Sequence, residues 1–251
     1  MPENTDHPVR LYAAGSLESA MERIIAAFAE AGYGPAEGTY GPSGLLRQRI
    51  EAGDPADVFA SADMAQPRTL AGSGLGGPVV RFARNELWAL TRPGLGIPTE
   101  DLLDRLLDPG VRVGTSTPGA DPSGDYARAV FERAEAVRPG SCEALEGKAL
   151  RLTGGPDIPE PPVGRNRYAW VLTEDRADVF LTYRTNALLA RRDTPELGIV
   201  ELPQELAVGA DYGLSLLRPD NPAAVRLALF VLSPEGQAIL VEEGFTSSER
   251  S

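Results

Sequence analysis

Three short segments place small and hydroxyl-bearing residues directly before a stretch with helical periodicity. They are Ala13-Ala14-Gly15-Ser16, Tyr40-Gly41-Pro42-Ser43-Gly44, and Thr115 to Asp125, which ends Asp121-Pro122-Ser123-Gly124-Asp125. A helix N-terminus exposes backbone N–H groups and carries partial positive charge, so each turn can accept an anion. Glycine lets the backbone approach a ligand closely, and serine adds a donor. The chemistry indicated is anion binding by neutral hydrogen-bond donors.

The same serines have a simpler interpretation as helix caps. Serine is preferred at the N-cap position, where its oxygen accepts a hydrogen bond from the first turn of the helix. For any one of Ser16, Ser43 and Ser123, capping is the commoner role. Three such turns in one chain favour a pocket on which they converge.

The sequence lacks the residue patterns that the common catalytic motifs need. Ser43 stands in Gly-Pro-Ser-Gly-Leu, which lacks the second glycine of a nucleophile elbow. A serine triad needs a histidine base, and the only histidine, His7, lies in a polar N-terminal tail. Gly147-Lys148-Ala149 has neither the upstream glycine loop nor the hydroxyl of a phosphate loop. We therefore expect a protein that is not an enzyme and needs no cofactor.

Three acidic residues, Asp54, Asp57 and Asp63, lie close enough in sequence to suggest a metal site. No histidine or further acidic motif completes such a site, and the single cysteine, Cys142, excludes a thiolate cluster and an internal disulfide. We expect these carboxylates to cap turns and to pair with arginines.

Composition limits the partners and the compartment. The net charge of −12 argues against nucleic acid, although neutral donors can still hold a small buried anion. No apolar run reaches the roughly 18 residues of a membrane-spanning helix. The sequence begins Met-Pro-Glu-Asn-Thr-Asp-His, without the basic and apolar regions of a secretion signal. Either a signal has been removed from a periplasmic protein, or the protein works in the cytoplasm.

Short apolar runs alternate with helical periodicity along all 251 residues, which is typical of an α/β fold. Val9 to Ala13, Val58 to Ser61 and Val179 to Tyr183 are predicted strands. We expect two lobes, each a mixed sheet flanked by helices, with the chain crossing near Arg84 and returning near Leu202 to Ala207. Lobe one then comprises residues 1–84 and 206–251, and lobe two residues 85–205.

Several motifs, in order along nearly the whole chain, resemble the molybdate-binding proteins of ABC transporters. The most specific is Ile50-Glu51-Ala52-Gly53-Asp54-Pro55-Ala56-Asp57-Val58-Phe59-Ala60-Ser61-Ala62-Asp63. The others are Ala13 to Leu17, Gly41 to Gly44, Arg84 to Leu87, Pro122 to Ala127, Thr182-Tyr183 with Asn186-Ala187, and Gly244-Phe245-Thr246.

The resemblance implies a monomeric periplasmic-binding-protein fold whose lobes close on a tetrahedral dianion, molybdate or tungstate, and deliver it to a membrane permease. Gly15, Ser16 and Ser43 would be the ligands from lobe one. From lobe two, Ser123, where the family often has alanine, would contribute its N–H, with its hydroxyl as a second candidate donor, and Tyr183 would contribute its phenol.

One departure from the family concerns the ligand. Family members usually offer a backbone N–H from a helix start about eighteen residues before the tyrosine, and here that place is Gly164-Arg165-Asn166, after a proline-rich insertion at 154–164. If Arg165 enters the pocket, sulfate, a phosphonate or a carboxylate becomes the better ligand, because a guanidinium binds such groups with two parallel hydrogen bonds. The alternative is a surface position. A cytoplasmic sensor for a small anion is a further possibility.

Overall fold

The computed structural model describes residues 7–155 and 157–247, which fall into two compact units. Unit 1 comprises Met1–Asn85 and Ala210–Ser251, and unit 2 comprises Glu86–Gly209. The chain thus passes from one unit to the other twice. The boundaries predicted from sequence, after residues 84 and 205, precede the observed ones, after residues 85 and 209.

Unit 1 is built on a mixed sheet whose strands follow the order β2-β1-β3-β9-β4. The strands are β1 (Val9–Ala14), β2 (Ala36–Gly41), β3 (Val58–Ser61), β9 (Gly209–Leu216) and β4 (Val79–Thr91), with the short β10 (Thr246–Ser247) antiparallel to β4. Strands β1, β2 and β3 are parallel, and β9 runs antiparallel to β3. Because Ala14 pairs with Gly41 and Ala13 with Ala60, the three parallel strands end at the same edge of the sheet.

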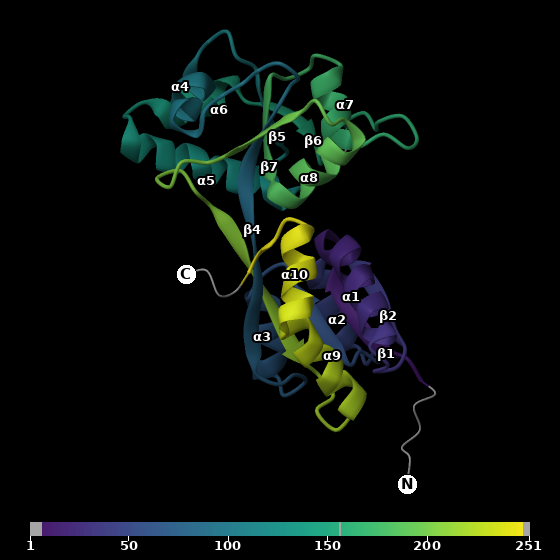
Figure 1. Ribbon diagram of the computed structural model, residues 1–251. Helices are drawn as coiled ribbons and strands as arrows, with labels where there is room; N and C mark the ends of the chain where they lie inside the picture. The colour runs from purple at the N-terminus through teal and green to yellow at the C-terminus, as the bar shows by residue number, and fades with distance from the viewer. Residues whose placement is uncertain (1–6, 156, 248–251) are drawn as a thin grey trace. The chain divides into compact units, whose positions relative to one another are not determined.

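The helices of unit 1 bury apolar faces. They are η1 (Gly15–Leu17), α1 (Glu18–Glu30), α2 (Ser43–Glu51), α3 (Ala65–Gly72), α9 (Pro222–Leu232) and α10 (Pro234–Glu242). Helix α1 buries Ala20, Met21, Ile24 and Phe28, which recur at helical spacing. Figure 1 shows α1, α9 and α10 side by side, and contacts among all three pairs confirm it. Leu46 and Ile50 of α2 join a second cluster around Phe59.

Unit 2 has its own mixed sheet, in which β4 continues between β8 and β7. Its other strands are β5 (Val113–Ser116), β6 (Leu150–Thr153), β7 (Val179–Tyr183) and β8 (Gly198–Glu201). Strands β6, β5 and β7 are parallel, while β4 runs antiparallel to both β7 and β8. The helices are η2 (Thr99–Asp101), α4 (Leu102–Leu107), α5 (Pro122–Val137), α6 (Ser141–Lys148), α7 (Arg167–Thr173) and α8 (Arg184–Asp193).

Two apolar clusters hold unit 2 together. Leu106, Val130 and Leu145 of α4, α5 and α6 pack in one, and Leu172 and Ala187 of α7 and α8 pack in the other. Among the described residues no single helix is long and apolar enough to cross a membrane, and only the pair α9 and α10, bent by 57°, together meets that criterion of length and composition.

Sequence periodicity located the strongly apolar elements and missed the polar ones. The helical spacing of Val225, Leu229, Leu232 and Ile239 predicts one interrupted helix from Asn221 to Glu243. The structure has α9 and α10 there, which meet at Ser233, where Pro234 begins a new helix. Strand β2 could not be predicted from sequence, because its residues Ala-Glu-Gly-Thr-Tyr-Gly show none of the alternation of a half-buried strand. Pairing with β1 along all six residues makes this segment a strand.

Candidate functional site

The edge of the unit 1 sheet where β1, β2 and β3 end carries two of the predicted serines. Ser16 lies in η1, directly after β1, and Ser43 is the first residue of α2, after β2. Ser61 is the last residue of β3, and Ala62 follows it. The parallel register therefore brings the residues Ser16 and Ser43, each of which directly follows a strand, to one edge of one sheet.

Ser43 is not a helix cap. Pro42 occupies the N-cap position of α2, and no side chain caps this helix. The Ser43 Oγ instead accepts a hydrogen bond from the backbone N–H of Ala62 at 3.1 Å. Because that bond uses a lone pair and leaves the hydroxyl proton unused, Ser43 is set up to donate.

Ser16 is exposed and also caps no helix. Its Oγ lies 2.9 Å from the phenol oxygen of Tyr212, on β9. The same phenol oxygen accepts a hydrogen bond from Asn85 Nδ2 at 3.4 Å. Tyr212 is 1% exposed and Asn85 is fully buried. The exposed Ser16 is therefore hydrogen-bonded to a tyrosine that belongs to a buried polar pair. Sequence reasoning missed Tyr212, because nothing local marks a residue 196 positions away as a partner of Ser16.

Gly15 precedes Ser16 at the start of η1 and is exposed. A Cβ added at this position would meet nothing within 4 Å, and its backbone conformation is one that any residue adopts. The structure therefore gives no steric reason for glycine here, and the candidate contribution of Gly15 is its backbone N–H in the first turn.

In unit 2, Tyr183 ends β7 and occupies the N-cap position of α8. Its ring is 8% exposed and packs against Tyr126, with ring centroids 5.8 Å apart. The pairing of Thr115 with Leu181 aligns the ends of β5 and β7, so Tyr183 lies at the same edge of its sheet as the turn that follows β5.

That turn, residues 117–124, conflicts with the expected role of Ser123. Ser123 is fully buried, its N–H donates to Asp121 Oδ1 at 2.9 Å, and its hydroxyl lies within hydrogen-bond distance of both Asp121 Oδ1 and Ser116 Oγ. Asp121 is the N-cap of α5. Both donors of Ser123 have acceptors inside unit 2, in a buried network that anchors α5, and this argues against the predicted role of Ser123 as a ligand.

The rest of this turn is also satisfied internally. The Thr117 N–H donates to Thr153 O, and the Gly119 N–H donates to Asp125 Oδ1. The Ala120 and Asp121 N–H groups both donate to Thr117 O, and the Gly124 N–H donates to Asp121 O. Pro118 and Pro122 have no N–H. The N-terminus of α5 is thus closed by its own carboxylate and carbonyls, and it offers no spare backbone donor to an anion.

Arg165 takes the surface position of the two alternatives. It is exposed, and its Nε lies 3.3 Å from Asp193 Oδ2. The neighbouring Asn166 caps α7 by accepting hydrogen bonds from the N–H groups of Tyr168 and Ala169. The guanidinium that would favour a carboxylate or phosphonate ligand is therefore engaged by a carboxylate of unit 2 itself.

The three aspartates act as predicted. Arg49 Nε lies 2.7 Å from Asp54 Oδ2, and Arg10 pairs with the buried Asp57 at 3.3 Å. Asp63 accepts hydrogen bonds from two backbone N–H groups at the start of α3. The prediction of turn caps and arginine pairs is confirmed.

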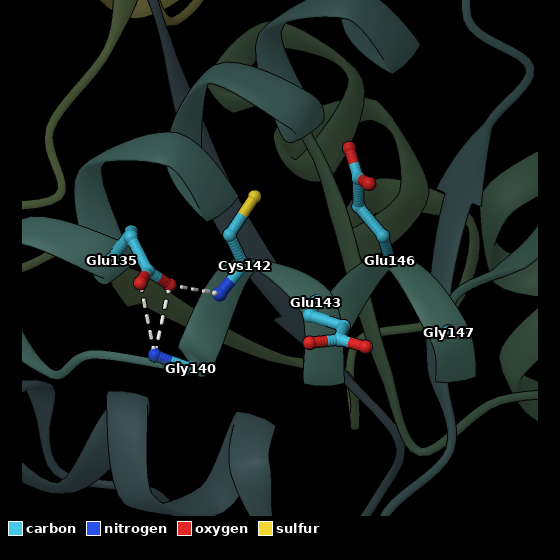
Figure 2. A pocket seen from close by; sticks show the side chains of 6 residues that line it. All are labelled: Glu135, Gly140, Cys142, Glu143, Glu146 and Gly147. Carbon is cyan, nitrogen blue, oxygen red and sulfur yellow. Dashed lines mark hydrogen bonds between the residues drawn. The ribbon is translucent and has the colours of Figure 1, made fainter.

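A depression of about 610 Å³ lies on unit 2, where the C-terminal end of α5 meets α6 (Figure 2). Its lining residues are Glu135, Gly140, Cys142, Glu143, Glu146 and Gly147. The Glu135 carboxylate accepts hydrogen bonds from the N–H groups of Gly140 and Cys142, which hold the pKa of Glu135 below its usual range. Three carboxylates repel an anion, so this depression is not a candidate oxyanion site.

The chain matches the model of the bacterial extracellular solute-binding proteins over residues 9–246, and it belongs to that family. It is therefore a solute-binding protein and not an enzyme, as the missing catalytic residues predicted. An uncharacterized protein of Pasteurella multocida is 35% identical to it over 239 residues, which cover 94% of this chain and 98% of the relative.

Solved structures resemble the whole chain. A substrate-binding domain from Clostridium difficile, provisionally assigned to a molybdenum ABC transporter, superposes with a TM-score of 0.78 at 22% identity, covering 96% of this chain and 99% of that one. The periplasmic molybdate-binding protein of Azotobacter vinelandii gives 0.69 at 17% identity, with 96% and 100% covered. PEB3 of Campylobacter jejuni, bound to L-phospholactate, gives 0.68 at 15%, with 95% and 99% covered. These likenesses confirm the mixed α/β fold of periplasmic binding proteins.

Proposed function

We propose that this solute-binding protein captures a tetrahedral oxyanion, molybdate or tungstate, for an ABC transporter. The observation that carries the proposal is the pair Ser16 and Ser43. Both hydroxyls stand at the start of a helix, at one edge of one sheet, and neither caps its helix. This combination of helix N-termini and hydroxyl donors suits a ligand that accepts hydrogen bonds on every oxygen.

The acidic surface does not oppose this function. A hydrogen bond to a charged acceptor contributes about 1.5–3 kcal/mol, and neutral hydroxyls and N–H groups supply it without a positive side chain. Several such bonds would sum to more than any real affinity, since desolvation and ordering subtract heavily. Donor geometry, more than net charge, then sets which anion is preferred.

Tyr183, at the end of β7, remains the candidate donor of unit 2 in this proposal. Ser123 drops out, because its donors are used within unit 2. Arg165 drops out as well, because it pairs with Asp193 on the surface. Without that guanidinium, the alternative of a carboxylate or phosphonate ligand loses its main support, and neutral donors favour a simple oxyanion.

The partner implied is the membrane permease of an ABC transporter. Family membership and the likeness to a substrate-binding domain assigned to such a transporter support this step. The protein would act as a monomer outside the cytoplasm, with the anion as its only ligand.

Isothermal titration calorimetry tests the proposal with molybdate, tungstate, sulfate, phosphate and L-phospholactate. We expect tight binding of molybdate and tungstate and weaker binding of sulfate, because a pocket sized for the larger anions holds the smaller one with longer hydrogen bonds. Binding of L-phospholactate alone would transfer the assignment to a phosphorylated carboxylate. No heat with any of the five would remove the oxyanion proposal.

A further inference from the structure

The hydrogen bond between Ser16 and Tyr212 joins the exposed candidate ligand to a residue with no access to solvent. Two aromatic neighbours pack edge-on against the Tyr212 ring: Phe82 at 6.5 Å and Phe245 at 5.3 Å between centroids. The ring cannot turn away without disturbing the core of unit 1. The packing of the ring therefore fixes the position of the Tyr212 phenol oxygen, to which the Ser16 hydroxyl is hydrogen-bonded.

Either hydroxyl can donate in the hydrogen bond between Ser16 and Tyr212, and the position of the Asn85 amide bears on which one does. The Asn85 amide nitrogen can only donate, so the Tyr212 oxygen accepts from it at 3.4 Å. Donation by the phenol to Ser16 Oγ, 2.9 Å away, gives a chain of hydrogen bonds in which each oxygen accepts from the group behind it, and this is the direction that the inference takes. With its oxygen accepting the phenol proton, Ser16 has its own single proton left for an outside acceptor. Ser43 is arranged the same way, since its oxygen accepts from the Ala62 N–H.

We infer that Tyr212 is a positioning residue for anion binding. It holds the Ser16 oxygen as an acceptor, so that the Ser16 proton is directed at the ligand, and Asn85 sets the orientation of the phenol. The inference rests on the proposed function and deepens it, because it names a buried residue that tunes the affinity without touching the anion. The two serines of unit 1 then share one arrangement: the hydroxyl oxygen accepts a hydrogen bond from within the unit, and the hydroxyl proton is left to donate to the ligand.

Tyr212→Phe tests this by removing only the phenol oxygen. Tyr12→Phe is a matched control, because Tyr12 is a buried tyrosine of the same unit whose hydroxyl donates to Asp54, far from Ser16 in the hydrogen-bond network. We expect Tyr212→Phe to weaken molybdate binding about fivefold, the loss typical of one neutral hydrogen bond, and Tyr12→Phe to change it less than about twofold. Thermal unfolding of both variants reports any general loss of stability.

Ser16→Ala completes a double-mutant cycle that a merely structural role would not satisfy. If Tyr212 acts through Ser16, adding Tyr212→Phe to Ser16→Ala should leave the affinity for molybdate unchanged. Wild-type affinity in Tyr212→Phe, or a full additional loss in the double variant, would overturn the inference while leaving the proposed function standing. A wild-type protein that binds none of the oxyanions would remove both.

Discussion

A serine at the start of a helix can cap it or face a ligand, and its partners decide which. Ser233 shows the first role, because its Oγ accepts the N–H of Gly236 and so caps α10. Ser43 is suited to the second role that we propose for it, because it stands one position later, inside α2, with its oxygen bonded to a neighbouring turn. The residue type is the same. The one-position difference changes what the hydroxyl can reach.

The two serines provide a matched pair of substitutions. Ser43→Ala should weaken molybdate binding by about tenfold, the loss of one hydrogen bond to a charged acceptor, while α2 keeps its N-terminus. Ser233→Ala should leave affinity unchanged and lower the free energy of unfolding by about 1 kcal/mol through the lost cap. Calorimetry and urea unfolding measure the two effects. Unchanged affinity in Ser43→Ala would reduce this serine to a structural role.

At the scale of elements, the end of β6 and the residue after it contact the turn at residues 117–124, which precedes α5. Thr117 N–H and Oγ1 both donate to Thr153 O, at 2.9 and 3.0 Å. Gly154 has a φ of +76°, and a Cβ there would stand 2.5 Å from the Cβ of Asp121, the cap of α5. Glycine at this position lets the β6 end lie directly against the cap.

The two ends of the segment at 154–164 allow a controlled test of that contact. Gly154 and Gly164 both have positive φ, but a Cβ at Gly164 would meet nothing within 4 Å. Gly164→Ala should therefore lower the free energy of unfolding by about 1 kcal/mol, the cost of the left-handed conformation alone. Gly154→Ala should cost about 2–4 kcal/mol, because it adds a steric clash. Equal losses in urea unfolding would show that the Asp121 contact is relieved without cost.

At the scale of the whole molecule, each unit has its own sheet and core, so each can respond separately to pH. In unit 2 the buried Asp178 accepts hydrogen bonds from the Arg112 N–H, the Arg112 side chain and Arg92 Nε, at 2.8 to 2.9 Å. The Arg112 guanidinium, then its backbone N–H and Arg92, hold the pKa of Asp178 well below its usual range. This carboxylate ties the end of β4 to the strands β5 and β7.

Because the folded-state pKa of Asp178 is depressed, its contribution to the free energy of unfolding must decrease as the pH is lowered. The ionised Asp178 stabilises unit 2 fully above its unfolded-state pKa of about 3.9. That stabilisation begins to decrease as the pH falls below this value, and it is lost only as the pH approaches the much lower folded-state pKa. Asp178→Asn should lower the free energy of unfolding by about 2–3 kcal/mol at pH 7, and this loss should shrink gradually as the pH is lowered from about 4 toward 2. Asp220→Asn, at the exposed pair with Arg218, is the control and should change little over this pH range. A loss for Asp178→Asn that does not shrink in acid would contradict this account.

What the sequence by itself determined is local. The apolar faces of α1, α5 and α9, the buried strands and the missing histidine base followed from residue types and short-range periodicity. So did the two serine turns of unit 1, together with an architecture of two lobes built from both ends and the middle of the chain. Each of these depends on residues a few positions apart, and the periods of helix and strand make them readable.

Only the tertiary structure decided how each donor is used. Ser123 and Ser43 sit in similar turns, yet Asp121 and Ser116 take the donors of one, while Ala62 leaves the proton of the other unused. Arg165 pairs with Asp193, and Ser16 with Tyr212, 196 residues away. A hydroxyl or guanidinium can bond with many partners, and the order and register of strands distant in the sequence select one of them.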